Sequence, residues 1–173
     1  GDIARRLLTA VLTLPQVRQL LSSEHFSVDG TLIEAWASMK SFVPKDGGNA
    51  PPQDRGGSGG RNAERNFHGE TRSNDTHTST SDPGARLYRK GNGKEAKLSY
   101  MGHATTENRH GLVVETEMTQ ATGTAEREAA KTMIESHAPG SERRLTVGAD
   151  KAYDTADFVA GMRQMCVTPH VAQ

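Results

Sequence analysis

The sequence has little cysteine, few aromatic residues and no long hydrophobic run. Its single cysteine, Cys166, excludes an internal disulfide and a cysteine-based zinc cluster. No stretch approaches the roughly 18 apolar residues of a membrane span, and the opening residues lack the basic-then-apolar pattern of a signal peptide. We therefore expect a cytoplasmic protein with no membrane partner. Because apolar residues make up only 34% of the 173 residues, we also expect part of the chain to lie outside a packed core.

Charge of either sign is not in excess, since 21 basic residues balance 21 acidic ones. A dedicated nucleic-acid binder is usually basic, so the total argues mildly against one. The distribution is uneven, however: residues 54–97 carry nine basic and six acidic side chains, and residues 107–135 carry three basic and six acidic. A basic segment beside an acidic one can serve a polyanion on one side and a cation on the other. Ordinary surface charge is the alternative interpretation.

The hydrophobic pattern divides the chain into four parts. Residues 1–23 have apolar side chains at helical spacing, and Pro15 is expected to start a second short helix. Residues 24–43 open with the alternation of a half-buried strand. Residues 44–86 are rich in glycine and proline, and Phe67 is the only large apolar residue between Pro44 and Gly84; this composition predicts a long flexible insertion. Residues 87–173 form the fourth part.

In residues 87–173 the pattern predicts an antiparallel strand pair followed by helix, strand, helix and strand. We expect strands at 97–106 and 112–119, joined by a turn at 108–111. A helix at 125–137 follows, with Glu126 and Glu128 at the positive end of its dipole. A strand at 144–150, a helix at 155–165 capped by Asp154 and a strand at 167–171 complete the pattern. This order predicts an α/β fold with a mixed sheet and flanking helices. Because the sequence stops directly after that strand, we expect a covering element to be missing at the C-terminus.

Two aspartates are marked by their phase in the predicted strands. Phe26 and Val28 face one side of the first strand, and Asp29 faces the other. Asp150 likewise lies on the face opposite Leu145, Val147 and Ala149, at the end of a later strand. A sharp change of structure is expected after each aspartate, at Gly30-Thr31 and at residues 151–154. If the two strands are neighbours, the two carboxylates converge at one edge of the sheet.

Two converging carboxylates repel each other unless a cation lies between them. Mg²⁺ fits such a pair, because it takes one or two carboxylates and retains waters and phosphate oxygens. A pair of such ions about 3.5–4 Å apart activates a water and stabilises the leaving oxygen in phosphodiester cleavage. The alternative is that each aspartate is a turn former or helix cap. Since Asp154 is expected to cap the following helix, Asp150 is left available for another role.

Two other conspicuous side chains have structural interpretations. Cys166 lies between Met165 and Val167 and is expected to be a small core residue. Trp36 follows Leu32 and Ile33 and is expected to anchor packing rather than to stack on a nucleic-acid base.

Several blocks of the sequence together resemble bacterial insertion-sequence transposases of the DDE class. Residues 25–38 (HFSVDGTLIEAWAS) resemble the first catalytic block, and residues 148–154 (GADKAYD) resemble the second. Between them, four further blocks fit in order: 74–77 (NDTH), 82–87 (DPGARL), 94–103 (KEAKLSYMGH) and 120–127 (QATGTAER). The resemblance covers the chain from about Leu20 to its end. Ala152 stands where glycine is commoner in the family.

The resemblance implies a ribonuclease-H-like fold in which Asp29 and Asp150 are the first two acids of a D-D-E triad binding Mg²⁺ or Mn²⁺. It implies hydrolysis of double-stranded DNA at transposon ends and attack of the freed 3′-hydroxyl on target DNA. Self-association and a location at the bacterial nucleoid are also expected. The residues expected to contact DNA are Arg86, Arg89, Lys90, Lys94, Lys97 and Lys151.

The chain also departs from the family pattern. No glutamate matches the setting of the family's third acid, which lies on a helix after the last strand, and residues 1–23 resemble only the tail of the preceding DNA-binding region. We therefore expect a truncated catalytic domain, incomplete at its C-terminus, that does not cleave DNA by itself.

Two alternatives remain open from the sequence. The chain can be a catalytically inactive remnant that binds DNA or a full-length transposase through its basic segment. It can also be a stand-alone nuclease of the same fold, which needs a third acid from within the chain; Glu34 and Glu115 are the candidates.

Overall fold

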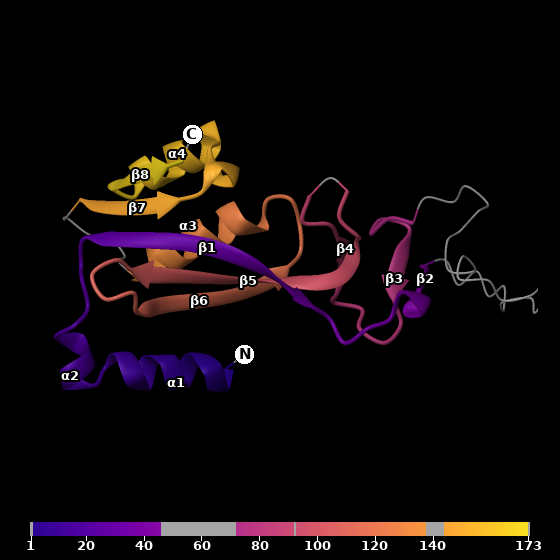
Figure 1. Cartoon of the computed structure of the whole chain (residues 1–173), viewed down its shortest axis with the longest axis horizontal. Helices are drawn as coiled ribbons and strands as arrows, with labels where there is room; N and C mark the ends of the chain where they lie inside the picture. Colours follow the sequence, from indigo (N-terminus) through magenta and orange to yellow (C-terminus); the bar gives the residue numbers. More distant parts are fainter. Residues whose placement is uncertain (1, 46–71, 92, 138–143, 173) are drawn as a thin grey trace, which may run out of the picture.

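A computed structural model describes residues 2–45, 72–91, 93–137 and 144–172. Its centre is a mixed sheet of β1 (His25–Glu34), β4 (Arg86–Tyr88), β5 (Lys97–Glu107), β6 (Val113–Gln120), β7 (Leu145–Ala149) and β8 (Val167–Val171). The strand order is β4-β5-β1-β7-β8, and β6 also pairs with β5. β1 is antiparallel to β5 and parallel to β7, and β8 is parallel to β7. The predicted α/β class with a mixed sheet is confirmed (Figure 1).

β5 is long enough to hold two partners on the edge away from β1. Its first residues, Lys97 to Ser99, pair with β4, and Tyr100 to Thr106 pair with β6. The predicted hairpin between β5 and β6 is present, with Gly111 in its turn at a φ of 73°. The sheet therefore has two parts: β6, β5, β1, β7 and β8 lie side by side in one, and β4, β5 and β1 lie side by side in the other.

Two helices follow the hairpin and pack against the sheet. α3 (Ala125–His137) contacts β5, β6 and β1, and α4 (Ala156–Gln164) contacts β8 and α3. α3 spans the residues predicted for it. The main core forms between these helices and the sheet. Its buried members are Phe26, Val28, Val114, Ala130, Ile134, Leu145, Val147, Tyr153, Phe158, Met162 and Val167.

The N-terminal residues form α1 (Asp2–Leu12) and α2 (Pro15–Arg18), and Pro15 starts the second helix as predicted. α1 contacts β6 and lies on the side of the sheet away from α4 (Figure 1). Its apolar residues are largely exposed, with Ile3 at 84% and Leu7 at 65%. No helix in the described ranges has the length and apolar character needed to cross a membrane.

β1 runs through the point at which the sequence predicted a break. Gly30 and Thr31 stay in the strand and pair with His103 and Gly102 of β5. The expected change of structure after Asp29 is therefore wrong. The β-branched Thr31 and Ile33 favour an extended chain, and β5 supplies the backbone partners that keep the strand in register.

A small second sheet joins the end of the predicted segment 24–43 to the predicted flexible insertion 44–86. β2 (Phe42–Pro44) pairs with β3 (His77–Ser79), and Phe42, Ala85 and Leu98 form a second buried cluster. Regular structure thus begins before the predicted residue 87. Residues 46–71, with Phe67, lie outside the described residues.

Three smaller predictions are corrected. Thr155 caps α4, since its side chain accepts a hydrogen bond from the Phe158 N–H, so the expected cap Asp154 is wrong. Cys166 is exposed, because it forms the turn into β8 at a φ of 60°. Trp36 is fully exposed beyond the end of β1 and anchors no packing.

Candidate functional site

Asp29 and Asp150 lie at matching positions on neighbouring parallel strands. Ser27 of β1 pairs with Gly148 of β7, and each aspartate follows two residues later. Both are exposed, whereas Phe26 and Val28 on the other face of β1 are buried. The two aspartates line one groove of about 700 Å³, together with His170 and neighbouring strand residues. The convergence predicted from phase is thus present in the structure.

Each aspartate uses one carboxylate oxygen for a local hydrogen bond. Oδ1 of Asp29 accepts from the Gly30 N–H at 2.8 Å, and Oδ1 of Asp150 accepts from the Ala152 N–H at 2.9 Å. Asp150 thereby caps the 3₁₀ turn Lys151–Tyr153, so the capping role considered for it is present. The second oxygen of each carboxylate has no hydrogen-bond partner in the described part of the chain. One oxygen on each strand is therefore available to a ligand in the groove.

A third carboxylate, Glu126, reaches this region from the first turn of α3. A Cβ added to Gly30 would lie 2.8 Å from Glu126 Oε1, so the glutamate passes directly over the glycine next to Asp29. Burial raises the pKa of Glu126, and the charges of Asp150 and Asp29 raise it further. Lys90 and Arg127 act in the opposite direction. The three carboxylates therefore share one electrostatic environment.

Glu126 was not predicted as a site residue, because in the sequence it is marked only as a favourable charge at a helix N-terminus. The available signal was Gly30, a residue without a side chain directly after a candidate catalytic acid. Such a glycine leaves room for a group from another element. The sequence alone does not say which group fills that room.

The base of the site is rigid. Tyr153 is buried and packs edge-to-face on Phe158, with ring centroids 5.3 Å apart. Arg127 Nη1 donates to the carbonyl of Ala152 at 3.1 Å, which ties α3 to the turn after Asp150. Burial raises the pKa of Tyr153 strongly, followed by the charges of Glu126, Asp29 and Asp150. Tyr153 is therefore a neutral, packed support beneath three negative charges.

The carboxylate oxygens are of the type that a hard divalent cation binds, but the site does not supply a complete set of protein ligands. Carboxylate oxygens are the ligands that Mg²⁺ prefers, and one or two of them suffice when waters complete the coordination. Across residues 2–45, 72–91, 93–137 and 144–172, no group of three or more His, Cys, Asp or Glu side chains is placed to hold a metal ion. Asp29 and Asp150 are thus the residues that would hold a divalent cation, and Glu126 would act on it through its charge.

The two glutamates considered as a third acid lie elsewhere. Glu34 is five residues beyond Asp29 on β1, about 16 Å along a strand, and it forms an ion pair with Lys97 at 2.9 Å. Glu115 lies on β6, where it pairs with Thr105 of β5, and its charge acts on His137 of α3. The structure brings neither of them to Asp29.

The six basic residues predicted to contact DNA are dispersed. Lys90, Lys94 and Lys97 line one cavity, and Lys90 also acts on Glu126. Arg86 is occupied by backbone carbonyls, since its Nη1 donates to Pro83 at 2.9 Å and to Ala85 at 3.1 Å. Arg89 is exposed, and Lys151 follows Asp150 on the surface. Of the six, Lys90 is the residue that the structure connects electrostatically to the carboxylates.

Comparison with known proteins gave no match: no protein-family model, no curated protein and no solved structure matches this chain.

Proposed function

We propose that this chain is a DNA-processing domain of the DDE transposase type. In this proposal Asp29 and Asp150 hold Mg²⁺ or Mn²⁺ for hydrolysis of DNA at transposon ends and for strand transfer. The observation that carries it is that the two aspartates lie on adjacent parallel strands and line one groove. The mixed sheet, antiparallel from β6 through β5 to β1 and parallel from β1 to β8, agrees with the ribonuclease-H-like fold that the sequence resemblance implies.

The chemistry follows from the properties of the residues in the groove. A bound divalent ion would supply activation of a water and stabilisation of the leaving oxygen. Asp29 and Asp150 each offer one free oxygen, and their backbone hydrogen bonds fix the direction of the carboxylates. Tyr153 and Phe158 exclude water from beneath the site. Glu126 adds a third negative charge, which raises the attraction of the groove for a cation.

Metal binding is the first test, because it does not require cleavage activity. Mg²⁺ should be titrated into the protein while backbone amide shifts are followed by NMR, and Mn²⁺ should broaden the same amides. We expect changes centred on the last residues of β7 and the middle of β1. Asp29→Asn and Asp150→Asn should each weaken the apparent affinity at least tenfold.

Glu128→Gln is the matched control, since Glu128 lies on the same helix as Glu126, is exposed and does not act on the site. It should leave the titration unchanged. Equal responses from wild type, Asp29→Asn and Asp150→Asn would refute the metal site.

A second candidate is a catalytically inactive module that binds DNA or a transposase. It is favoured by Lys90 and Lys94, which are exposed and whose side chains form no hydrogen bond or ion pair within the described ranges. This candidate predicts a DNA affinity that falls steeply with salt and survives Asp29→Asn. DNA affinity that does not change with salt would count against it.

A further inference from the structure

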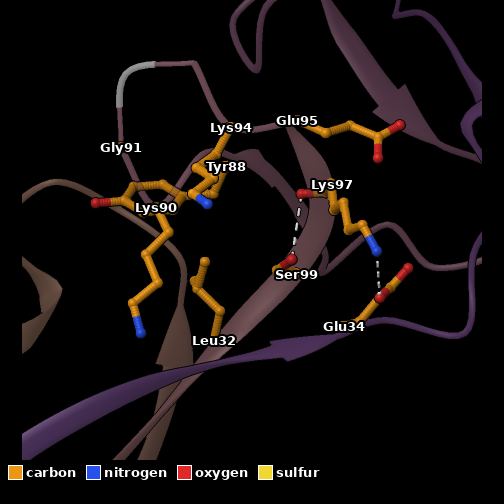
Figure 2. A pocket seen from close by; sticks show the side chains of 9 residues that line it. All are labelled: Leu32, Glu34, Tyr88, Lys90, Gly91, Lys94, Glu95, Lys97 and Ser99. Atoms are coloured by element: carbon orange, nitrogen blue, oxygen red, sulfur yellow. Dashed lines mark hydrogen bonds and ion pairs between the residues drawn. The ribbon is translucent and has the colours of Figure 1, made fainter.

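A cavity of about 470 Å³ lies between β1, β5 and the loop after β4. Leu32, Tyr88 and Ser99 form its floor, and three lysines and two glutamates surround it (Figure 2). The lining residues are Leu32, Glu34, Tyr88, Lys90, Gly91, Lys94, Glu95, Lys97 and Ser99. The cavity combines apolar and cationic walls, which suits a ligand with a flat apolar part and a negative group.

Charge is separated across this cavity. Lys97 lies on the side of Glu34 and Glu95, whereas Lys90 and Lys94 lie on the side of Tyr88 (Figure 2). The hydrogen bond to Glu34, then the charge of Glu34, raises the pKa of Lys97, and Glu95 adds to this. The positive charge of Lys97 is thus already balanced by the neighbouring carboxylates. The positive charge available to a ligand is that of Lys90 and Lys94.

The floor of the cavity is firm and aromatic. Leu32 and Tyr88 are half-buried and pack against the buried cluster of Met101, Ala121 and Ala125. Base stacking on an aromatic side chain tolerates every base, because each base has a π-face. A base paired within a duplex presents only its edge to the grooves, so Tyr88 is suited to an unpaired base.

The cavity lies near Glu126, on the face of β1 that packs against α3. Leu32 lies on β1 two residues after Gly30, about 7 Å along the strand, and Gly30 is covered by Glu126. Ala125, in the cluster beneath Tyr88, directly precedes Glu126. Lys90 is close enough to act on Glu126. Because side chains alternate along a strand, Leu32 shares the face of β1 that carries Val28 and Gly30, whereas Asp29 points to the opposite face.

We propose that this cavity, the nucleotide pocket, binds one unpaired nucleotide of a DNA strand. The base rests on Tyr88 and Leu32, and the phosphate lies between Lys90 and Lys94. Its assignment to the strand being processed rests on the proposed function, but binding to the pocket does not require a metal. The pocket adds a preference for unpaired DNA.

The test measures binding in EDTA, with a short labelled single-stranded oligonucleotide and its duplex followed by fluorescence anisotropy. We expect the single strand to bind several-fold more tightly than the duplex. Lys94→Ala and Lys90→Ala should each weaken single-strand binding and lower the slope of log affinity against log salt by about one. Tyr88→Ala should weaken it about tenfold, whereas Tyr88→Phe should retain most of the affinity.

Arg163→Ala is the control for charge alone, because Arg163 is an exposed cation on α4. It should leave the affinity unchanged, and a loss equal to that of Lys94→Ala would overturn the pocket. Lys94 is exposed, so its variant keeps the test decisive even if Tyr88→Ala does not fold. Equal affinity for single strand and duplex would also overturn the proposal.

Competition separates a nucleotide from a bare anion. A deoxynucleoside monophosphate should displace the oligonucleotide, and inorganic phosphate at the same concentration should not; equal displacement would overturn the role of Tyr88. Asp29→Asn should keep its single-strand affinity in EDTA, and loss of that affinity would overturn the independence of the pocket from the metal. Single-strand binding with no Mg²⁺ response would support the pocket and refute the metal site, so the two proposals fail separately.

Discussion

Glu107 and Glu126 are two partly or fully buried glutamates in opposite surroundings. Glu107 ends β5 and is fully buried, and four backbone N–H groups donate to it: Ser22 and Arg109 to Oε2, at 3.2 and 3.0 Å, and His110 and Leu112 to Oε1, at 2.7 and 3.1 Å. Glu126 is half-buried, and the charges of two other carboxylates act on it. Burial raises the pKa of Glu107, but the backbone donors together outweigh burial and hold the pKa below its ordinary value. The pKa of Glu126 is instead raised.

The contrast separates a structural carboxylate from one that is available for chemistry. The charge of Glu107 is fully used, because it fixes the turn after β5 and the approach to β1. The charge of Glu126 is attracted by Lys90 and Arg127, but burial and the charges of Asp29 and Asp150 outweigh that attraction, and a cation near the three carboxylates would relieve their repulsion. Perturbed carboxylates of this second kind are candidates for functional sites.

Removing the charge of Glu107 should have the largest effect on this contrast. Glu107→Ala leaves one buried and three partly buried backbone donors without their acceptor, so we expect the free energy of unfolding to fall by about 3 kcal/mol. Urea denaturation followed by circular dichroism measures this loss. Glu128→Ala should change the free energy of unfolding by less than about 0.5 kcal/mol, and comparable losses in the two variants would show that Glu107 is not a structural carboxylate.

The pH dependence of stability should sharpen the same difference. The pKa of Glu107 is lower in the folded chain than its ordinary value of 4.5. Its contribution is therefore complete above that ordinary value and disappears as the pH falls through the lowered pKa. Urea midpoints measured between about pH 6 and about pH 3 should fall more steeply for wild type than for Glu107→Gln. Parallel curves would contradict the assignment.

Gly30→Ala should perturb the other carboxylate with a smaller effect on stability. The new methyl group would lie 2.8 Å from Glu126 Oε1, so the flexible end of the glutamate must move away. We expect a loss of about 1 kcal/mol or less in the free energy of unfolding, together with a weaker Mg²⁺ response. Gly123→Ala is the control, since a Cβ there meets nothing within 4 Å. An unchanged Mg²⁺ response in Gly30→Ala would show that Glu126 does not matter to the groove.

Glu126→Gln should have the smallest effect on folding and the opposite sign. Removing one of three like charges should raise the free energy of unfolding by about 0.5 kcal/mol at neutral pH. The Mg²⁺ affinity should fall at the same time. A variant that is clearly less stable than wild type, measured in the same urea titration, would place Glu126 in the same class as Glu107 and remove the contrast.

The local pattern of the sequence predicted most elements, and the failures have physical causes. The sequence predicted strands at the positions of β1, β5, β6, β7 and β8, and it predicted the helix 125–137 at its observed bounds. β2 and β3 were missed because each has only three residues and gains its stability by pairing across a long stretch of chain. The cap at Thr155 and the exposure of Trp36 were missed because neighbouring residues offered equally plausible alternatives.

By itself the sequence determined which face of its strand each aspartate occupies, because side chains alternate with a period of two whatever the strand packs against. Only the tertiary structure decided that β1 and β7 are neighbours, that α3 carries Glu126 over Gly30, and that Lys90 and Lys94 flank a cavity with Tyr88. Periodicity is a local property of the chain. Which faces meet depends on burying Ala129, Ala130 and Met133 of α3 against the sheet, and that choice involves the whole core at once.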